Sequence, residues 1–561
     1  MTPQTDKAAA DFRVLIVYPN LPLMLVPSIS IAIFTRIFRD LGYQIDLFET
    51  THYDTNDLDY SETNINYSEN RVRLLNARKF DVEKDLGISI KRGMLSDFRT
   101  KVETFDPDFI IYSVVEDTFF QARSMMQAIA DLKIPHLVGG VFPTMAPEEC
   151  IAAPEIDLIA LGEGEKTVKA VGEAVRTGQP LNGIPGTWLK NPDGSIEKTQ
   201  QPSLVNLNDI IPDFSLFHPS RFNRPMGGKV FRMVPVESYR GCPYACTYCN
   251  SPTQRLLSKN AGLGNFMRRK SMDSLRDKLR ALYDAYKPDF FFFVDDSFLA
   301  RPRQEIFDFC DMYEEFRLPF YFNTRAENCD AEILARLKEV GCYRIAFGIE
   351  SGNQQYRQKV LRRKISNEEI IERFKVIADS GIAFSINLII GMPGETRDLV
   401  MDTIELARSI KGYDAVTAFI FTPYHGTPLR QVALDNNWLD PNTITRHNTS
   451  RSLLTMPPPY LNADEIDGLL AVLPLYCYFP KTDWPKIRRA ESNDEEGLRL
   501  RAELSAIYAE NFLGEDQKRA KKFVQPDGTI ADKQQLSDFR ISPERIQAAD
   551  LKSLTDPMIG L

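Results

Sequence analysis

One loop with three cysteines limits what this chain can fold into more than any other stretch. Residues 241–249 read Gly-Cys-Pro-Tyr-Ala-Cys-Thr-Tyr-Cys and directly follow an apolar, strand-like run at residues 233–239. Three thiolates this close in sequence can surround one soft metal centre. A cluster of four irons needs four ligands, so three cysteines leave one iron open to another molecule. A ferredoxin-type electron carrier would supply a fourth cysteine, but none lies within sixty residues of Cys249.

Two simpler interpretations of the cysteines are disfavoured. Structural zinc needs four protein ligands in a closed tetrahedral site, and the nearest candidates, Cys310, Cys329 and Cys342, are single residues far apart in sequence. No histidine lies between His218 and His425. Eight cysteines among 561 residues are also too few for a secreted, disulfide-rich scaffold.

Length and charge narrow the class of protein further. A chain of 561 residues exceeds what one hydrophobic core usually supports, so two or three domains are expected. The net charge of -9 and the lack of a basic tract argue against a nucleic-acid partner. The first eleven residues are polar, unlike a signal peptide, and no apolar run is long enough to span a membrane. We therefore expect a cytoplasmic protein.

The first region, residues 12–200, alternates strand and helix patterns. Apolar strand-like runs lie at residues 12–18, 44–48, 109–115, 136–138 and 156–161. This pattern predicts a doubly wound, Rossmann-like α/β domain that binds ligands at the carboxyl ends of its strands. Gly139, Gly140 and Gly162 lie at two of these ends, where they either admit a ligand or only form tight turns. No G-x-G-x-x-G follows the first strand, so a dinucleotide fingerprint is missing.

Two further stretches frame this region. Residues 50–95 form an insertion much longer than a normal crossover, and the sequence does not say whether it contacts cofactor, substrate or a second subunit. A proline-rich linker is predicted at residues 201–232, where we place the domain boundary.

The second region, residues 233–430, repeats a strand-then-helix unit six times. The strands are predicted at residues 234–239, 289–294, 319–323, 343–348, 384–390 and 418–421. This predicts a partial (β/α)6 barrel with active groups at the strand carboxyl ends. Polar residues occupy those ends or the strands themselves: Asp295, Asp296, Arg325, Glu350 and Asn387. Buried charges are rarely unpaired, so this ring indicates a polar ligand.

Structural roles remain open for several of these residues. Asp295 or Asp296 could cap the next helix, and Arg325 could pair with Glu350 as a buried ion pair. His425 could act as a general base, but its turn favours a structural role. Residues 431–561 are predicted to be a mainly helical C-terminal region without a recognisable motif.

Cys242, Cys246 and Cys249, with the aromatic Tyr248 before the last, resemble the cluster loop of the radical S-adenosylmethionine (SAM) superfamily. The resemblance implies a [4Fe-4S] cluster whose open iron chelates SAM, and cleavage of SAM to a 5′-deoxyadenosyl radical. An external electron donor such as flavodoxin or ferredoxin would reduce the cluster. The positions that match the superfamily's SAM contacts, by the same resemblance, are Tyr248, Asp295, Asp296, Arg325, Glu350 and Asn387.

The first region resembles the cobalamin-binding domain of a large radical SAM subgroup. There, a Gly-Gly after the fourth strand and a Gly-Glu-Gly-Glu after the fifth border the nucleotide tail of cobalamin. Residues after the third strand would lie nearest the lower face of cobalt, and no Asp-x-His-x-x-Gly motif offers a histidine ligand. The cobalamin contacts implied in this way are Gly139, Gly140, Gly162, Glu163, Ser113 and Glu116.

The resemblance implies a cobalamin-dependent radical SAM enzyme. The reaction that it implies for this chain is methylation of an unactivated carbon, or less often of phosphorus, on a small molecule or peptide, through methylcobalamin and the 5′-deoxyadenosyl radical. Cyclisation or rearrangement without methyl transfer is the first alternative. A tRNA methylthiotransferase is disfavoured, because that class carries three cysteines in its N-terminal domain and this region has only Cys150. A non-catalytic metal-binding module is the last alternative.

Overall fold

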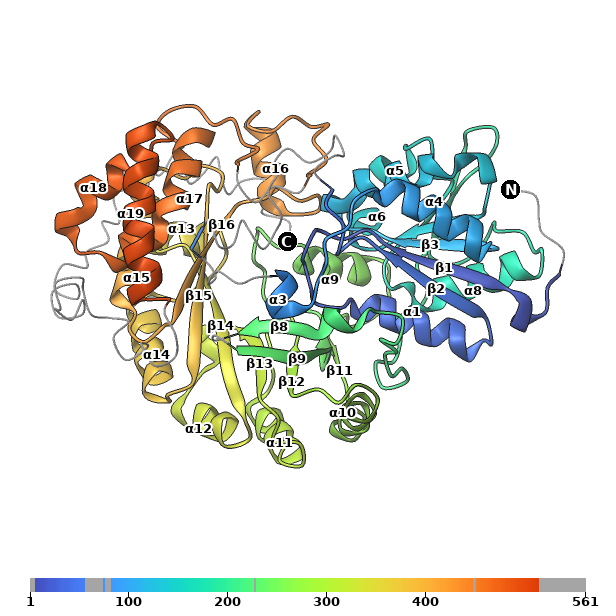
Figure 1. Ribbon diagram of the computed structural model, residues 1–561, viewed down its shortest axis with the longest axis horizontal. Helices are drawn as coiled ribbons and strands as arrows, with labels where there is room; N and C mark the ends of the chain where they lie inside the picture. Colours follow the sequence, from blue (N-terminus) through green and yellow to red (C-terminus); the bar gives the residue numbers. More distant parts are fainter. Residues whose placement is uncertain (1–5, 56–73, 76–81, 227–228, 447–450, 514–561) are drawn as a thin grey trace.

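The computed structural model describes residues 6–55, 74–75, 82–226, 229–446 and 451–513. The chain folds into two lobes, each built around one seven-stranded sheet (Figure 1). Most of the first half of the predicted 50–95 insertion, and all residues after 513, lie outside the described residues. No helix within the described ranges is long and apolar enough to cross a membrane.

The N-terminal sheet has the strand order β2-β1-β3-β4-β5-β6-β7. Its first five strands are parallel, which confirms the predicted doubly wound domain. A hairpin, β6 and β7, adds two antiparallel strands beside β5. The strands span Arg13–Tyr18 (β1), Gln44–Glu49 (β2), Phe109–Ser113 (β3), His136–Gly139 (β4), Leu158–Ala160 (β5), Thr187–Lys190 (β6) and Ile196–Lys198 (β7).

Helices cover both faces of this sheet because its strands are apolar on both sides. Alternate residues of β1 point to opposite faces: Val14 and Ile16 pack with α1 (Ile29–Asp40) and α8 (Gly164–Arg176). Leu15 and Val17 pack with α4 and α5 on the other face. The remaining helices of this lobe span Met94–Phe105 (α4), Phe119–Ala128 (α5), Val141–Met145 (α6) and Pro147–Ile151 (α7). The short helix Val82–Leu86 (α3) instead contacts β8 (Asn223–Met226) of the second sheet (Figure 1).

The second sheet has the order β16-β15-β14-β13-β12-β9-β8 and curls into the predicted partial barrel. Strands β9 and β12–β16 are parallel, and β8, which the sequence did not predict, pairs antiparallel with β9. The strands span Asn223–Met226 (β8), Lys229–Val236 (β9), Phe290–Phe293 (β12), Phe320–Thr324 (β13), Cys342–Glu350 (β14), Ala383–Ile390 (β15) and Ala415–Ile420 (β16). A short separate ribbon, Tyr239–Arg240 (β10) with Arg268–Arg269 (β11), flanks the cysteine loop.

The two faces of the curled sheet differ in burial. Phe291 and Phe320 are fully buried on the outer face, whereas Phe292 and Tyr321, their neighbours on the inner face, are only half-buried. The helices that cover the outer face span Met272–Tyr286 (α10), Arg303–Tyr313 (α11), Ala331–Glu339 (α12), Asn367–Asp379 (α14) and Arg397–Ser409 (α15). A short helix, Gln354–Lys359 (α13), lies between β14 and α14 in the chain. In contrast, α9 (Ser251–Asn260) lies between the two lobes (Figure 1).

The C-terminal region is helical, as predicted, and packs beside the barrel's last strand. Its helices span Pro428–Asp435 (α16), Ala463–Tyr478 (α17), Trp484–Arg489 (α18) and Glu495–Asn511 (α19). Asn462 and Glu465 form a capping box that begins α17. Arg397 of α15 pairs with Glu491 at 2.5 Å, and Arg408 donates to the Tyr476 carbonyl at 2.5 Å. These bonds fix the region against the edge of the barrel.

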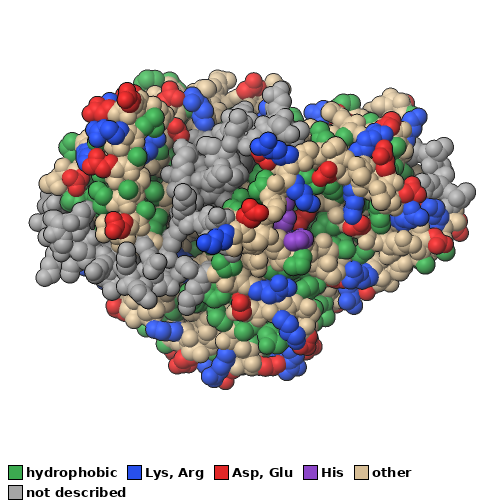
Figure 2. All heavy atoms as spheres, viewed as in Figure 1, with side chains coloured by type: hydrophobic (Ala, Val, Ile, Leu, Met, Phe, Trp, Pro, Cys, Tyr) green, Lys and Arg blue, Asp and Glu red, His purple; other side chains and the backbone are tan. Residues whose placement is uncertain are grey.

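Charged side chains of both signs are interspersed over both lobes on the face drawn in Figure 2. No extended basic patch gathers on the visible described part of that face. A nucleic-acid-binding surface would concentrate lysine and arginine on one face or along one groove.

Candidate active site

The three cysteines lie in the loop that follows β10. Asp295 fixes the backbone segment that leads into this loop. Asp295 accepts hydrogen bonds from the Ser238 backbone N–H at 2.8 Å, from the Tyr239 N–H at 3.1 Å and from the Ser238 hydroxyl. Arg301 pairs with it at 3.1 Å, and both side chains are almost completely buried. Asp295 thus holds the chain three to four residues before the cysteine loop begins. It does not cap a helix, because α11 begins after Pro302.

Asp296 contacts the other end of the loop. Its carboxylate accepts a hydrogen bond from the Ser251 hydroxyl at 2.8 Å. The Ser251 backbone N–H in turn donates to the Cys249 sulfur at 3.4 Å. Burial raises the pKa of Asp296, and the Ser251 hydroxyl opposes that shift. The two adjacent aspartates therefore brace the start and the end of the cysteine loop.

Cys242, Cys246 and Cys249 are half-buried free thiols. Burial raises the pKa of Cys242 to about 11 and of Cys249 to about 12. Among the described residues, no three Cys, His, Asp or Glu side chains are gathered tightly enough to hold a single metal ion. In a four-iron cluster each thiolate binds a different iron, so its sulfurs stand farther apart than the ligands of one zinc ion. Three cysteines on one loop can each bind a different iron of such a cluster and leave the fourth iron without a protein ligand.

Arg325, after β13, lies beside the cysteine loop. Its guanidinium stacks over the Tyr244 ring at 3.8 Å, lies 4.0 Å from the Cys246 sulfur and pairs with Glu327. Its Nε is buried and has no hydrogen-bond partner. A buried unpaired donor next to the cluster loop fits a residue that awaits an anionic ligand. The structure excludes the alternative that Arg325 and Glu350 pair directly, since each has a different partner.

Glu350 ends β14 and forms a buried triad with Tyr248 and Arg363. Arg363 donates to Glu350 Oε1 at 3.0 Å and to the Tyr248 hydroxyl at 3.0 Å, and Tyr248 donates to Glu350 at 3.3 Å. Glu350 adopts the left-handed region, φ +68°, which is strained for this residue type and clusters at functional sites. Burial raises the pKa of Glu350, although Arg363 opposes the shift. The sequence did not predict a role for Arg363, because it is one of several lysines and arginines in residues 357–364.

The Gly-x-Glu pattern at the end of β14 has a steric cause. A side chain at Gly348 would collide with the Glu350 carboxylate, which folds back over it. Asn387 of β15 lies directly beside Gly348 and also pairs in register with Thr417. It is half-buried, and its side chain makes no hydrogen bond within the described part of the chain. Four of the predicted residues therefore lie together at the mouth of the barrel: Tyr248, Arg325, Glu350 and Asn387.

A cavity of about 370 Å³ lies at the carboxyl ends of the N-terminal strands. The predicted residues Ser113, Gly139, Gly140, Gly162 and Glu163 line it. Its volume suits part of a large ligand, such as a nucleotide tail. No histidine is among the lining residues.

Gly140 and Gly139 differ in what they tolerate. A Cβ at Gly140, φ +118°, would meet the Val114 backbone nitrogen at 2.9 Å and collide with its carbonyl. Gly140 is thus required by the packing of the chain itself, whatever ligand binds. A Cβ at Gly139 would meet only Ala160 Cβ at 3.5 Å, an ordinary contact. Gly139 is therefore the position at which an added side chain would enter the cavity without breaking the fold.

Glu163 joins the two lobes. Arg240, two residues before Cys242, donates to Glu163 at 2.8 Å and to Glu165 at 2.9 Å, and pairs with Glu237 at 2.9 Å. Arg268 also pairs with Glu163. Burial would raise the pKa of Glu163, but these arginines hold it below its usual value.

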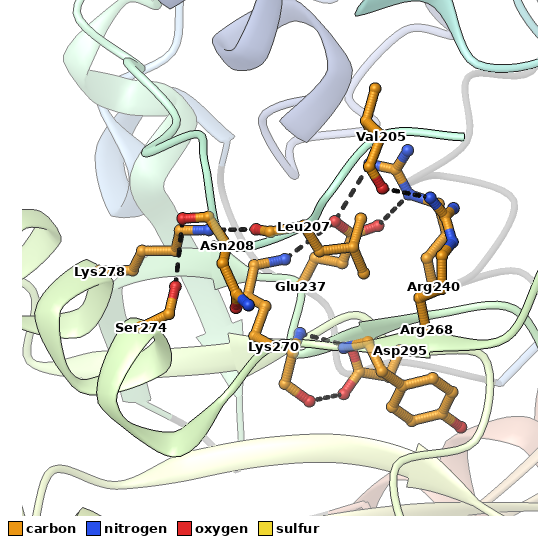
Figure 3. Close-up of polar contacts among 12 residues, drawn as sticks. Val205, Leu207, Asn208, Glu237, Arg240, Arg268, Lys270, Ser274, Lys278 and Asp295 are labelled. Carbon is orange, nitrogen blue, oxygen red and sulfur yellow. Dashed lines mark hydrogen bonds and ion pairs between the residues drawn. The ribbon is translucent and has the colours of Figure 1, made fainter. Parts of the chain in front are cut away.

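The predicted linker is part of the same contact. Figure 3 shows Arg240 and Arg268 beside Val205, whose carbonyl accepts from Arg268 at 2.5 Å. Lys278 of α10 donates to the Leu207 carbonyl, and Ser274 to the Asn208 carbonyl at 3.3 Å. Residues 205–208 are therefore docked on the barrel and connect it to the cavity wall.

Glu116 is buried away from the cavity lining. It accepts hydrogen bonds from the His425 Nδ1 at 2.9 Å, the His425 backbone N–H at 2.9 Å and the Thr445 N–H at 2.8 Å. Burial would raise its pKa, but these bonds hold it low. The adjacent Asp117 accepts from the Tyr424 hydroxyl at 2.9 Å. These contacts support the structural role for His425 and hold the loop after β3 against the barrel.

Two family models match this chain. Residues 72–172 match the B12 binding domain, and residues 236–407 match the Radical SAM superfamily. Among curated proteins, an uncharacterized methyltransferase of Pyrococcus horikoshii, PH0819, is 27% identical over 64% of this chain and 78% of its own length. The anaerobic magnesium-protoporphyrin IX monomethyl ester cyclase of Rubrivivax gelatinosus is 23% identical over 59% of this chain and 60% of its own length.

Two solved structures share the fold across both lobes. The radical S-adenosylmethionine methyltransferase TsrM from Kitasatospora setae, with cobalamin and a [4Fe-4S] cluster bound, has a TM-score of 0.54 at 15% identity and covers 84% of this chain and 82% of its own. The cobalamin-dependent S-adenosylmethionine radical enzyme OxsB has a TM-score of 0.59 at 14% identity and covers 98% and 79%. Both family models match in the same order as the two lobes, and the cysteine loop and the strand-end cavity fit the cofactors that these domains bind. The chain therefore combines a B12 binding domain with a radical SAM domain, in the order of its two lobes.

Proposed function

We propose that this enzyme methylates a carbon or phosphorus centre of a small molecule or peptide, using SAM, a [4Fe-4S] cluster and cobalamin. The observation that carries the proposal is that one helix, α9, contacts both sites: Ser251 and Arg255 lie against the cysteine loop, and Gln254, Leu257 and Ser258 line the strand-end cavity. When bound, the cluster and SAM supply a 5′-deoxyadenosyl radical and the cobalamin supplies a methyl group. Similarity to the PH0819 and TsrM methyltransferases supports this choice.

The residues of the barrel mouth have separate tasks in this proposal. Arg325 binds the carboxylate of SAM with a charge-assisted hydrogen bond. Glu350 binds its amine or ribose, and Arg363 orients the Glu350 side chain. Asn387 adds a neutral amide. A one-electron donor of the flavodoxin or ferredoxin kind reduces the cluster from outside.

Cyclisation without methyl transfer is the second candidate, favoured by the similarity to the magnesium-protoporphyrin cyclase. A tRNA methylthiotransferase fits less well. Its class needs a second cluster in the N-terminal domain, whereas this region matches a B12 binding domain and its Cys150 is buried in the core.

Product mass separates the first two candidates. Purified enzyme with SAM, cobalamin, a reductant and compounds chosen from its genomic neighbourhood is analysed by mass spectrometry. Gain of one methylene unit in the product, with the label transferred from methyl-labelled SAM, is the expected result. Loss of hydrogen without transfer of the label would instead establish a cyclase.

A further inference from the structure

Helix α9 presents different residues to the two cofactor sites. Ser251 and Arg255, one turn apart, contact the cysteine loop: Ser251 donates to the Cys249 sulfur, and Arg255 donates to the Cys242 carbonyl at 2.7 Å. Gln254, Leu257 and Ser258 lie at positions i, i+3 and i+4, which share one helix face, and all three line the 370 Å³ cavity. One helix therefore forms part of both sites.

Two polar side chains on the cavity face of α9 have no partner. Ser258 is only 3% exposed, and its hydroxyl makes no hydrogen bond. The side-chain amide of Gln254, one turn earlier, makes no hydrogen bond within the described part of the chain. A buried hydroxyl usually finds a partner, because burying it unpaired costs free energy. An unpaired hydroxyl and an amide at one cavity wall indicate a ligand with polar groups at that wall.

The side chains that α9 contributes to the cavity wall indicate which chemical groups of a ligand would bind there. The α9 residues are a hydroxyl, an amide and an apolar side chain, all without charge. Arg240, the cation in the same lining, is already paired with three glutamates. The wall therefore suits neutral donors and acceptors beside an apolar ring, as in a ribose joined to an uncharged heteroaromatic base.

We infer that the barrel lobe, through Gln254, Leu257 and Ser258 of α9, completes the binding site for the nucleotide tail of cobalamin. The inference rests on the proposed function in one respect, that the cavity holds this tail. The N-terminal domain supplies the strand-end wall, with Gly139 and Gly162, and α9 supplies the facing wall. Because Ser251 and Arg255 of the same helix contact the cysteine loop, tail binding and cluster assembly stabilise the same position of α9.

The first test measures the affinity of the purified, cluster-loaded protein for hydroxocobalamin by equilibrium dialysis. Ser258→Ala should weaken binding about two- to tenfold, the loss expected for one neutral hydrogen bond. Ser258→Leu, which places a larger apolar group at the cavity wall, should weaken it further. The matched control is Ser124→Ala on α5, whose hydroxyl bonds within its own helix to the Phe120 carbonyl; its affinity should equal that of the wild type.

Gly139→Val separates failure of this inference from failure of the proposed function. Gly139→Val should expel cobalamin by filling the strand-end wall. If it does so while both Ser258 variants bind normally, α9 is no part of the site and the inference is overturned, although the cofactor assignment stands. If the wild type itself binds no cobalamin, both fail.

The second test measures coupling between the two sites. Hydroxocobalamin affinity is compared between cluster-loaded protein and protein from which the cluster has been removed by chelation, with circular dichroism to show that the chain stays folded. Weaker binding by the cluster-free form, within the roughly 5- to 150-fold range common for coupled sites, is the expected result. Equal affinity in both forms would refute the coupling through α9.

Discussion

Both lobes place binding groups at the carboxyl ends of a parallel sheet, but they do so with opposite kinds of residue. In the N-terminal lobe glycines lie at two of the strand ends that line the cavity, where the lack of side chains leaves room. In the barrel lobe charged side chains fill the strand ends and hold one another in buried pairs, such as Glu350 with Arg363. The N-terminal lobe is built to receive a bulky group, and the barrel to orient a charged one. Mutations should therefore act by blocking space in one lobe and by removing charge in the other.

The largest effect is expected in the barrel lobe, at the cysteines. Replacement of Cys242, Cys246 and Cys249 together by Ala should abolish the cluster, which in the wild type should hold about four irons bound through thiolates. Iron content and absorbance after anaerobic reconstitution measure it. The Cys310→Ala variant, at a buried cysteine of the outer core, is the matched control and should keep its iron. A normal cluster in the triple variant would show that these three cysteines are not its ligands.

The next effect concerns the charges that join the two lobes. Arg240→Gln leaves Glu163, Glu165 and Glu237 close together without their shared cation. Breaking such a buried network should lower the free energy of unfolding by about 3–5 kcal/mol. Chemical denaturation measures this loss. Arg276→Ala, which removes an exposed pair with Asp273, should change it by less than about 1 kcal/mol. Equal effects of the two variants would show that the lobes are not held together by this network.

A smaller effect is expected for SAM binding at the barrel mouth. Arg325→Ala or Glu350→Ala should each cost about 1.5–3 kcal/mol, or about ten- to a hundredfold in SAM affinity. Cobalamin affinity should stay unchanged, because neither residue lines the cavity. Isothermal titration of cluster-loaded protein measures both ligands. If neither variant binds SAM more weakly, these residues serve the structure and not the ligand.

A further effect is a pH dependence at the loop after β3. Burial raises the pKa of Asp117 to about 7, the Glu116 charge adds to the shift, and the Tyr424 hydrogen bond opposes it. Between about pH 4 and pH 7 the folded protein then binds a proton that the unfolded chain has lost, so this group's stabilisation falls as pH rises through that window. Asp117→Asn should remove that part of the slope. Denaturation midpoints of both proteins across the window check it, and identical slopes would contradict it.

The contrast between the lobes also explains what the sequence could predict. The cysteine loop, the charged strand ends and the Gly-Ile-Glu pattern at Gly348 are local patterns with a chemical meaning, so they predicted the barrel and its cluster. Arg363 could not be assigned, because its role depends on how residues 351–362 return to the strand end. Glu163 and Glu116 were assigned to cobalamin by resemblance. The structure places both in contacts between the lobes, which no local pattern reveals.

The cavity wall on α9 was equally beyond sequence reasoning. Gln254 and Ser258 look like ordinary polar helix residues. Only the folded protein shows that they line the cavity and that the buried Ser258 hydroxyl has no hydrogen-bond partner. The strand β8 was missed for a related reason. It is a four-residue edge strand containing Pro225, a residue that weakens any prediction of a strand.

The central claim is that one chain binds a cluster and a cobalamin between its two lobes and uses them on SAM. The most direct measurement takes a single anaerobic preparation, reconstituted with iron, sulfide and hydroxocobalamin and passed through gel filtration. Its iron, its cobalamin and its reductive cleavage of SAM to 5′-deoxyadenosine are then determined. We predict about four irons and one cobalamin per chain, together with SAM cleavage that depends on the reductant. A preparation that cleaves SAM but retains no cobalamin would contradict the account.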